Sequence, residues 1–528
     1  MKVLVFHGWL LSGTGSNVYN ASLCTALAAQ GHAVQMVCQD HDVPDLAAGK
    51  TGSVTIHNPD IGGVLPVFVH DTYEGFTVKT FGELTDAELD DYIDRNVVAV
   101  REIVDSLGGV DAALANHLVM APVILHRAGL QYAIKVHGSD LSYTILPDLE
   151  RFGPYAREAA ENAAGILVGS GHIADRLRQA VDEPPINAKV RLGPPGVDTD
   201  LFSPTPPGQR ASTLQGLANA LRGGGGAEVS GEPDSAASGA VRRGPSAPPP
   251  PTPSSPPTAS SWDRDLGAAA DAVEWYAGAA GPRVIFVGKT IVSKGVDLLL
   301  AAWPQVHRAH PGARLLLVGF GALEPVLRRV QAGLDGGDLG PLRELAERGR
   351  GLEDGPEERL SMLSAFLERA PDDYAERARG AAGSVRLAGR LEHDEVAVAI
   401  DASDALVFPS TFPEAFGMVA AEAAAAGALP LSANHSGAAE VSRELEAGLD
   451  PETRGLISFD LDDNAVEAIA TRLDRWLELG DRERELASGS LRATAERLWS
   501  WDGVARTVLA AAAGRLDDLP RPAVDEAR

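Results

Sequence analysis

The chain has 528 residues, 45% of them hydrophobic, and is therefore long enough for two globular domains with additional sequence. Its 73 acidic and 46 basic side chains give a formal net charge of −27, which argues against nucleic acid as a partner and against unaided adhesion to anionic membranes. No apolar run reaches the roughly 18 residues of a membrane-spanning helix, so the sequence predicts no transmembrane segment and leaves only peripheral membrane contact open.

The two cysteines, Cys24 and Cys38, fall in predicted packed elements of the first domain. Buried free thiols are typical of a reducing compartment, so we expect a cytoplasmic protein. The first residues, MKVLVFHGWLLSG, lack the small-residue cleavage site of a signal peptide, and we interpret them as the first strand.

A strand–helix–strand unit opens the first domain, which we place at 1–204. Its first loop contains Gly13 and Gly15, whose missing side chains let a main chain approach a phosphate or a sugar closely. The loop lacks the third glycine of a dinucleotide fingerprint. A simple tight turn is the alternative interpretation.

A second polar loop follows the strand QYAIKV and reads His137-Gly138-Ser139-Asp140. Ligands bind at the carboxyl ends of strands in open α/β sheets, so His137 is a candidate ligand contact. The alternative for a histidine taken alone is a structural role with its hydrogen bonds satisfied.

Residues 205–281 are rich in Gly, Ser, Ala and Pro, with GGGG at 223–226. Such a composition buries too little apolar surface to order itself, so we predict a disordered insertion between the domains. It serves either as a spacer or as a docking segment for a partner.

The second domain is placed at 282–498 and begins with a strand, a loop and a helix. The loop contains Lys289 and Lys294, cations at a strand end where a diphosphate could bind; the alternative is two solvated lysines. Residues 331–383 exceed the length of one crossover helix and predict extra surface helices.

The end of the chain contains further helices. Residues 499–515 are predicted to form a helix that crosses back to the first domain, and residues 516–528 are predicted to fray.

The most informative stretch is Phe408 to Val441, with the core PEAFGMVAAEAAAAG. It predicts a buried strand, a loop and an Ala-rich helix closed by Gly427. Glu414 falls in the loop and Glu422 falls on the helix, eight residues later. The main-chain N–H groups at the helix N-terminus favour an anion, and these groups belong to Phe416, Gly417 and Met418. Taken alone, the two glutamates could equally be a helix cap and a surface residue.

In its context this stretch resembles the donor-binding signature of the family 4 glycosyltransferases, retaining enzymes of the GT-B fold. The resemblance extends to HGSD, to GVDTDLFSP at the end of the first domain, to the Lys294-Gly295 loop and to the segment Ala438-Glu440-Val441. It covers 1–204 and 282–515. It implies an α/β protein with two Rossmann-like domains facing a central cleft, here with a disordered insertion between them.

The resemblance also implies roles for these residues. Glu414 would bind sugar hydroxyls, Glu422 the ribose, and His137 the sugar from the opposite wall. Lys289 and Lys294 would neutralise the donor diphosphate. Lys289 departs from the family, which has an arginine there, so the charge is kept but the bidentate fork is lost.

Further residues are implied more weakly. Gly319 and Arg390 would lie against the nucleotide base, and the loop with Gly13 and Gly15 would lie between acceptor and donor diphosphate. No Asp-x-Asp occurs in a predicted strand-end loop, which agrees with the metal independence of the family.

The predicted function is that of a retaining, hexosyltransferase-like glycosyltransferase, which moves a sugar from a nucleoside diphosphate sugar to an acceptor hydroxyl. The acceptor is a saccharide, a small metabolite or a lipid, and no cofactor or metal is expected. The alternatives are another GT-B enzyme, an epimerase or a phosphorylase, and a non-catalytic nucleotide-sugar binding protein.

Overall fold

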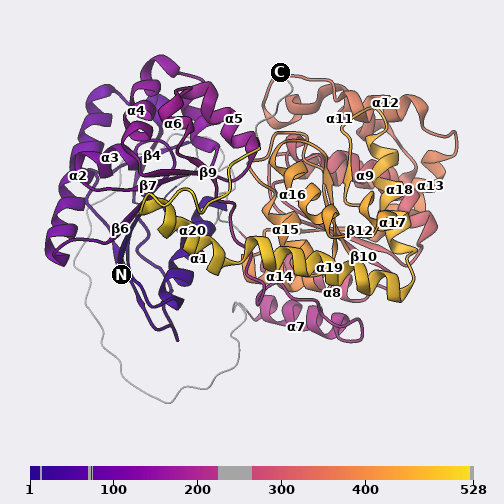
Figure 1. Cartoon of the computed structure of the whole chain (residues 1–528). Helices are drawn as coiled ribbons and strands as arrows, with labels where there is room; N and C mark the ends of the chain where they lie inside the picture. The colour runs from indigo at the N-terminus through magenta and orange to yellow at the C-terminus, as the bar shows by residue number, and fades with distance from the viewer. Residues whose placement is uncertain (12–14, 69–72, 74, 224–263, 524–528) are drawn as a thin grey trace, which may run out of the picture.

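The structure is a computed structural model of the whole chain, and it describes residues 1–11, 15–68, 73, 75–223 and 264–523. Two α/β domains lie side by side, and the last two helices run along both (Figure 1). Each domain has a parallel sheet that is covered by helices on both faces. Its strands are nearly continuous apolar runs, as expected for strands that are buried on both sides.

The N-terminal domain contains, within the described residues, a seven-stranded parallel sheet of order β3-β2-β1-β6-β7-β8-β9. Its strands are β1 (Lys2–Phe6), β2 (Ala33–Val37), β3 (Ser53–His57), β6 (Ala112–Asn116), β7 (Ala133–Val136), β8 (Gly165–Val168) and β9 (Val190–Leu192). A separate two-stranded sheet pairs β4 (Val64–Val67) with β5 (Thr77–Thr80).

Helices cover this sheet on both faces. They are α1 (Gly15–Ala29), α2 (Asp86–Leu107), α3 (Ala121–Arg127), α4 (Leu149–Asn162), α5 (Gly171–Ala180) and α6 (Pro184–Asn187). One apolar cluster joins the sheet to α1 and to the last helix of the chain, and the other joins it to α2, α3 and α4.

The C-terminal domain contains, in the described ranges, a six-stranded parallel sheet of order β12-β11-β10-β13-β14-β15. Its strands are β10 (Arg283–Val287), β11 (Arg314–Val318), β12 (Val385–Gly389), β13 (Ala405–Phe408), β14 (Leu429–Ala433) and β15 (Ser458–Phe459). Its helices are α7 (Arg210–Arg222), α8 (Leu266–Ala277), α9 (Val296–Ala309), α10 (Glu324–Gly336), α11 (Gly340–Arg348), α12 (Ser361–Arg369), α13 (Tyr374–Ala381), α14 (His393–Asp401), α15 (Met418–Ala425), α16 (Ser436–Ala447), α17 (Pro451–Arg454), α18 (Ala465–Leu477) and α19 (Asp481–Trp499).

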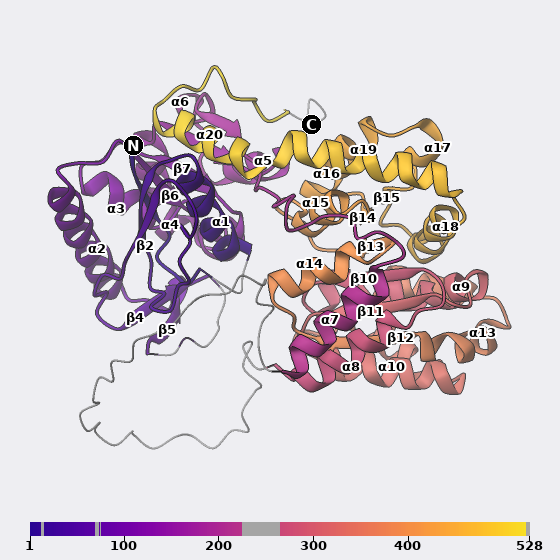
Figure 2. The same cartoon turned by 90° about the horizontal axis from the view of Figure 1, so that it is seen from below.

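The predicted disordered insertion at 205–281 is wrong at both of its ends. The helices α7 and α8 pack against each other there and join the core of the C-terminal domain (Figure 2). Leu214, Leu217 and Leu221 are buried at helical spacing. Arg210 also pairs with the buried Asp404, with 2.7 Å between Nη1 and Oδ1. The composition was averaged over the whole of 205–281, and this average concealed the apolar stripe. Residues 224–263 lie outside the described residues.

The end of the chain crosses back to the first domain. The helix α19 ends at Trp499, and α20 (Trp501–Ala512) packs on α1, β6 and β8. The expected fraying beyond Arg515 is wrong as far as Pro520, whose carbonyl oxygen accepts the Leu192 N–H at 2.8 Å. Arg191 Nε likewise donates to the Leu516 carbonyl at 2.7 Å, so this segment is held against β9.

No helix in the described ranges has both the length and the apolar character needed to cross a bilayer.

We expect Tyr276→Ala to lower the free energy of unfolding by about 3–5 kcal/mol, because Tyr276 is fully buried in α8 and its hydroxyl lies 2.8 Å from Ser403 Oγ. Urea denaturation measures this change. The exposed neighbour Ala268, changed to Ser, is the control and should stay within about 0.5 kcal/mol of wild type. A negligible loss in Tyr276→Ala would mean that α8 is not part of the folded domain.

Candidate active site

The loops at the carboxyl ends of the two sheets meet between the domains. Gly138 follows β7, Ala415 follows β13, and a Cβ added to Gly138 would lie 3.4 Å from the Ala415 Cβ. The residues beside them are His137 and Glu414, which the sequence singles out as site candidates. The fold therefore brings candidates from both domains to one seam.

Glu414 lies in the loop between β13 and α15, and its neighbours hold both its ends. Ser410 Oγ donates to Glu414 Oε1 at 2.6 Å, and the Glu414 N–H donates to Ser436 Oγ at 2.8 Å. The Gly437 N–H donates to the Glu414 carbonyl at 2.9 Å. A Cβ on Gly437 would lie 2.6 Å from the main chain of Ala415, so only glycine permits this approach.

Lys294 forms an ion pair with Glu414, and both side chains are about four-fifths buried. It ends the 3-10 helix Val292–Lys294, which follows β10, and β10 pairs in parallel with β13. Gly295 comes next with φ at +66°, and a Cβ there would lie 1.9 Å from the Pro409 carbonyl oxygen. A glycine after Lys294 is thus required by the contact between the two loops.

The other C-terminal candidates spread along the same sheet edge. Lys289 follows β10, is exposed, and forms no ion pair with any described residue. Gly319 follows β11, where a Cβ would lie 1.7 Å from the Gly288 carbonyl oxygen. Arg390 follows β12 and pairs with Glu392 at 3.0 Å.

Glu422 lies on α15, nearly buried, and is fixed by a histidine from α14. His393 Nε2 lies 3.0 Å from Glu422 Oε1. Burial disfavours the charged form of His393, but Glu422 outweighs that effect and raises the pKa of the imidazole. No pattern in the sequence indicates this partner.

The N-terminus of α15 faces the first domain. A Cβ added to Gly15, at the start of α1, would lie 3.9 Å from Met418 Sδ. Phe416 is buried, with its ring edge-on to Trp499 at 5.6 Å between centroids. Phe416, Gly417 and Met418 therefore place the first N–H groups of α15 at the seam, where an anion is favoured. Gly13 lies outside the described residues.

His137 is fixed by a chain of hydrogen bonds that starts at β6. Asn116 Nδ2 donates to the Phe6 carbonyl at 3.1 Å, so Asn116 Oδ1 is free to accept from His137 Nε2 at 2.9 Å. His137 therefore carries its proton on Nε2. Burial, followed by the nearby His117, Lys135 and His7, lowers the pKa of His137 well below its usual value.

Two further histidines stand at the ends of neighbouring strands and were not predicted. His7 follows β1, and its Nε2 lies 2.8 Å from Asn17 Oδ1. His117 follows β6 with φ at +66° and is fully buried, and neither of its ring nitrogens has a hydrogen-bond partner among the described residues. Its ring centroid lies 4.6 Å from that of His137 and 6.1 Å from that of His7.

Asp140 and Lys135 complete this wall. Asp140 is fully buried and accepts the N–H groups of Leu118 and Gly138, so it ties the loops after β6 and β7 together. Lys135 Nζ donates to the Gly193 carbonyl at 2.5 Å, and burial lowers its pKa to about 7.

Hydrogen bonds join the two domains directly. Ser170 Oγ donates to the Ala415 carbonyl at 2.7 Å. Glu440, on α16 of the second domain, accepts the N–H groups of Gly171 and His172 at 2.7 and 2.9 Å. A carboxylate of one domain thus caps the helix α5 of the other.

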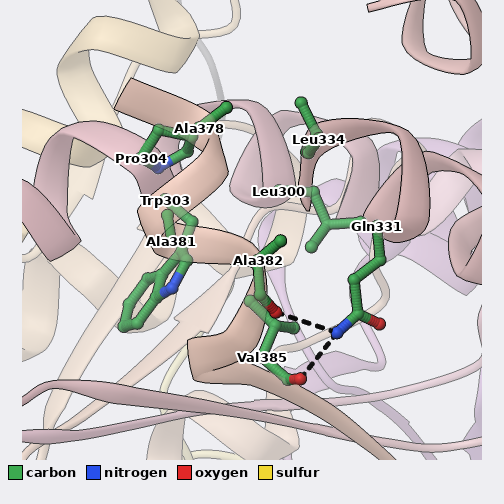
Figure 3. A pocket seen from close by; sticks show the side chains of 9 residues that line it. All are labelled: Leu300, Trp303, Pro304, Gln331, Leu334, Ala378, Ala381, Ala382 and Val385. Atoms are coloured by element: carbon green, nitrogen blue, oxygen red, sulfur yellow. Dashed lines mark hydrogen bonds between the residues drawn. The ribbon is translucent and has the colours of Figure 1, made fainter. Parts of the chain in front are cut away.

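A small apolar pocket lies elsewhere in the C-terminal domain, between α9, α10, α13 and β12 (Figure 3). Trp303, Leu300 and Val385 contribute to its wall, and Gln331 Nε2 donates to the carbonyls of Ala382 and Val385 there. None of the predicted site residues lines it.

Two family models match the chain, one in each domain. The model described as Glycosyltransferase Family 4 matches residues 13–201, and the model described as Glycosyl transferases group 1 matches residues 373–490. The glycogen synthases of two Mycobacterium tuberculosis strains are 26% identical over 257 residues, which is 48% of this chain and 49% of theirs. The match thus spans about half the length of these curated relatives.

Several solved structures share the fold over nearly their whole length. Sucrose-phosphate synthase from Thermosynechococcus elongatus is 17% identical, with 98% of each chain covered and a TM-score of 0.51. Anabaena HepE in complex with UDP and glucose is 15% identical, with 98% and 100% covered and a TM-score of 0.52. A glycosyltransferase from Rickettsia africae is 14% identical, with 96% of each covered and a TM-score of 0.54.

Two Rossmann-like domains whose sheet ends face each other define the GT-B glycosyltransferases, and the expected fold class is confirmed. The resemblance to the family 4 glycosyltransferases seen in the sequence is confirmed, because a glycosyltransferase model matches in each domain.

We expect His117→Phe to gain stability over wild type as the pH falls below 6.5. Native His117 stays neutral because burial, followed by the charge of His7, lowers its pKa, whereas the unfolded chain takes up the proton. The phenylalanine ring loses no hydrogen bond to the part of the chain that the structure describes, since His117 makes none there. The advantage should grow by up to about 1.4 kcal/mol per pH unit.

Thermal melting of both proteins between pH 8 and pH 5 measures this difference. Wild type alone is not diagnostic, because burial raises the pKa of Asp297 and Asp401 to about 7 and so stabilises the native state as the pH falls. If the difference in melting temperature between His117→Phe and wild type does not change with pH, the neutral, buried state of His117 is contradicted.

Proposed function

We propose that this glycosyltransferase moves a sugar from a nucleoside diphosphate sugar to an acceptor hydroxyl, with retention at the anomeric carbon. The observation that carries the proposal is the Lys294–Glu414 pair, held at the N-terminus of α15 where the two domains meet. A cation, a carboxylate and a helix N-terminus at one point suit a ligand with a phosphate beside sugar hydroxyls.

The diphosphate would bind to Lys294, Lys289 and the N–H groups that open α15. When the nucleoside diphosphate departs, negative charge grows on its phosphates, and these groups stabilise that charge. We assign this role to the protein's own cations and propose that the reaction requires no metal and no cofactor besides the donor.

The carboxylates and His137 would bind the rest of the donor. Glu414 would accept hydroxyls of the sugar, and Glu422, oriented by His393, would accept those of the ribose. His137 would contact the sugar from the first domain. Before the donor binds, Lys294 and Glu414 form an ion pair with each other. The donor would replace this ion pair by two interactions, one between its phosphate and Lys294 and one between a sugar hydroxyl and Glu414.

The reaction would proceed on one face of the sugar. The acceptor oxygen forms a bond to the anomeric carbon as the bond from that carbon to the phosphate oxygen breaks. The acceptor's proton passes to the departing phosphate, so no protein base is assigned. His137 would take up a proton poorly at neutral pH, because its pKa lies well below 6.5.

The nucleotide, the sugar and the acceptor are matters for experiment. Since HepE, a protein of the same fold, was crystallised with UDP, UDP is the first nucleotide to test. The acceptor hydroxyl is proposed to belong to a saccharide, a small metabolite or a lipid, and the reaction is placed in the cytoplasm, which suits the two buried free thiols.

We expect one of UDP, GDP, ADP and TDP to raise the melting temperature of the protein. A ligand at about 100 times its dissociation constant adds roughly 2.7 kcal/mol to the stability of the native state, which shifts the melting point by several degrees. Lys294→Ala should lose most of the shift, and Lys50→Ala, an exposed lysine of the first domain, should keep it. If no nucleotide shifts the wild type, the nucleotide site is refuted.

Glu414→Gln should retain nucleoside diphosphate binding but lose turnover by about 100-fold or more, because the amide removes the charge that binds the sugar hydroxyls in the transition state. Turnover is measured as release of the nucleoside diphosphate from a panel of sugar donors, with and without mixed acceptors. Glu444→Gln, on the exposed face of α16, is the control. Full turnover in Glu414→Gln would contradict its role, and donor binding without any turnover in wild type would favour a binding protein.

A further inference from the structure

The helical insertion at 331–383 is held rigidly on the C-terminal domain. Its helix α12 packs on α9 and α18. The loop between α11 and α12 folds back on itself, with the Leu360 N–H donating to the Ala346 carbonyl at 2.8 Å and the Glu358 N–H donating to the Arg348 carbonyl at 3.2 Å. The tip of this loop, the 3-10 helix η4 (Gly349–Glu353), therefore has a fixed place.

The tip reaches the loop that contains the two candidate lysines. Glu353 Oε1 accepts the Val292 N–H at 2.6 Å, a hydrogen bond between residues 61 positions apart. Glu353 is partly buried, and burial raises the pKa of its carboxyl against the lowering effects of the Val292 N–H and Arg350. A short bond from an amide to a carboxylate in such a setting is among the stronger hydrogen bonds of proteins.

Val292 opens the 3-10 helix that ends at Lys294. On its other side this turn is held by the site loop, because the N–H groups of Thr411 and Phe412 both donate to the Ser293 carbonyl, at 2.9 and 3.2 Å. The turn is thus fixed from two directions, by Glu353 of the insertion and by the loop that contains Glu414. Only Ser293 separates Val292 from Lys294, so a shift of Val292 moves the lysine.

The N–H groups of this turn have little other side-chain support among the described residues. Gly295, which precedes α9, supplies no side-chain cap. Asp297, in the first turn of α9, is buried, and the hydrogen bonds that its carboxylate accepts come from its own N–H and that of Leu298, not from the turn. Among the described residues, Glu353 supplies the one side chain that binds an N–H of the turn 292–294.

We propose that Glu353 is a positioning residue for Lys294, through which the helical insertion sets the affinity of the site for the diphosphate of the donor. The inference rests on the proposed function, since it takes Lys294 as a phosphate ligand. It gives the insertion a role in donor binding, although no residue of the insertion is placed against the donor itself. It also predicts that the effect of Glu353 depends on the β-phosphate.

The test compares Glu353→Ala, Glu353→Gln and the control Glu357→Ala, whose carboxylate lies in the same loop but is exposed and pairs with Arg348. Affinities for UDP and UMP are measured by calorimetry, or for the corresponding pair if another base binds better. We expect Glu353→Ala to weaken UDP about tenfold and UMP less than twofold. Glu353→Gln keeps an acceptor oxygen and should recover most of the loss, and Glu357→Ala should match wild type.

A second measurement separates this inference from the proposed function. Hydrogen exchange of the segment 289–295 without ligand should be faster in Glu353→Ala than in wild type and Glu357→Ala. Unchanged exchange, unchanged UDP affinity, or equal losses for UDP and UMP would each overturn the positioning role. If wild type binds no nucleotide but exchange is faster in Glu353→Ala, Glu353 does position the turn 292–294. In that case the role in diphosphate binding is refuted together with the proposed function.

Discussion

The ion pair between Lys294 and Glu414 is the interaction on which the arrangement of the donor side depends. Pairing two charges that are about four-fifths buried is costly unless their remaining polar atoms are satisfied, and Ser410 does this for Glu414. The pair also requires its two loops to touch, which neighbouring parallel strands permit only because Gly295 has no side chain. The same geometry keeps a cation and a carboxylate ready for a ligand that needs both.

The second constraint is the short distance between the domains. Ser170 donates to the carbonyl of Ala415, Glu440 caps α5, and a Cβ added to Gly138 would lie 3.4 Å from the Ala415 Cβ. A donor that binds between these surfaces would change these contacts, so we expect binding to be coupled to domain motion. The long α19–α20 connection, which packs on both domains, is the natural place for such a motion to bend, at Ser500.

What the sequence predicted well is local, because the main chain itself forms those features. The strand, loop and helix around Glu414 are fixed by residues within a few positions, and the structure places them as expected. The missed features depend on partners far along the chain. Glu353, Glu440 and His393 are ordinary residue types whose partners lie 29 to 269 positions away, so only the folded chain identifies them. The helices α7 and α8 were missed because a composition average hid their apolar stripes.

The two walls of the site differ in charge, and this difference bears on the proton in the proposed reaction. The C-terminal wall presents Lys289 and Lys294, whereas the N-terminal wall presents histidines that burial keeps neutral. A neutral imidazole with a strongly lowered pKa can donate a hydrogen bond, but it holds an extra proton weakly. Negative charge on the departing phosphate would therefore gather on the cationic side, and the phosphate would compete successfully with His137 for the acceptor's proton. Burial of the histidine wall thus favours a mechanism in which the leaving group, not the protein, is the base.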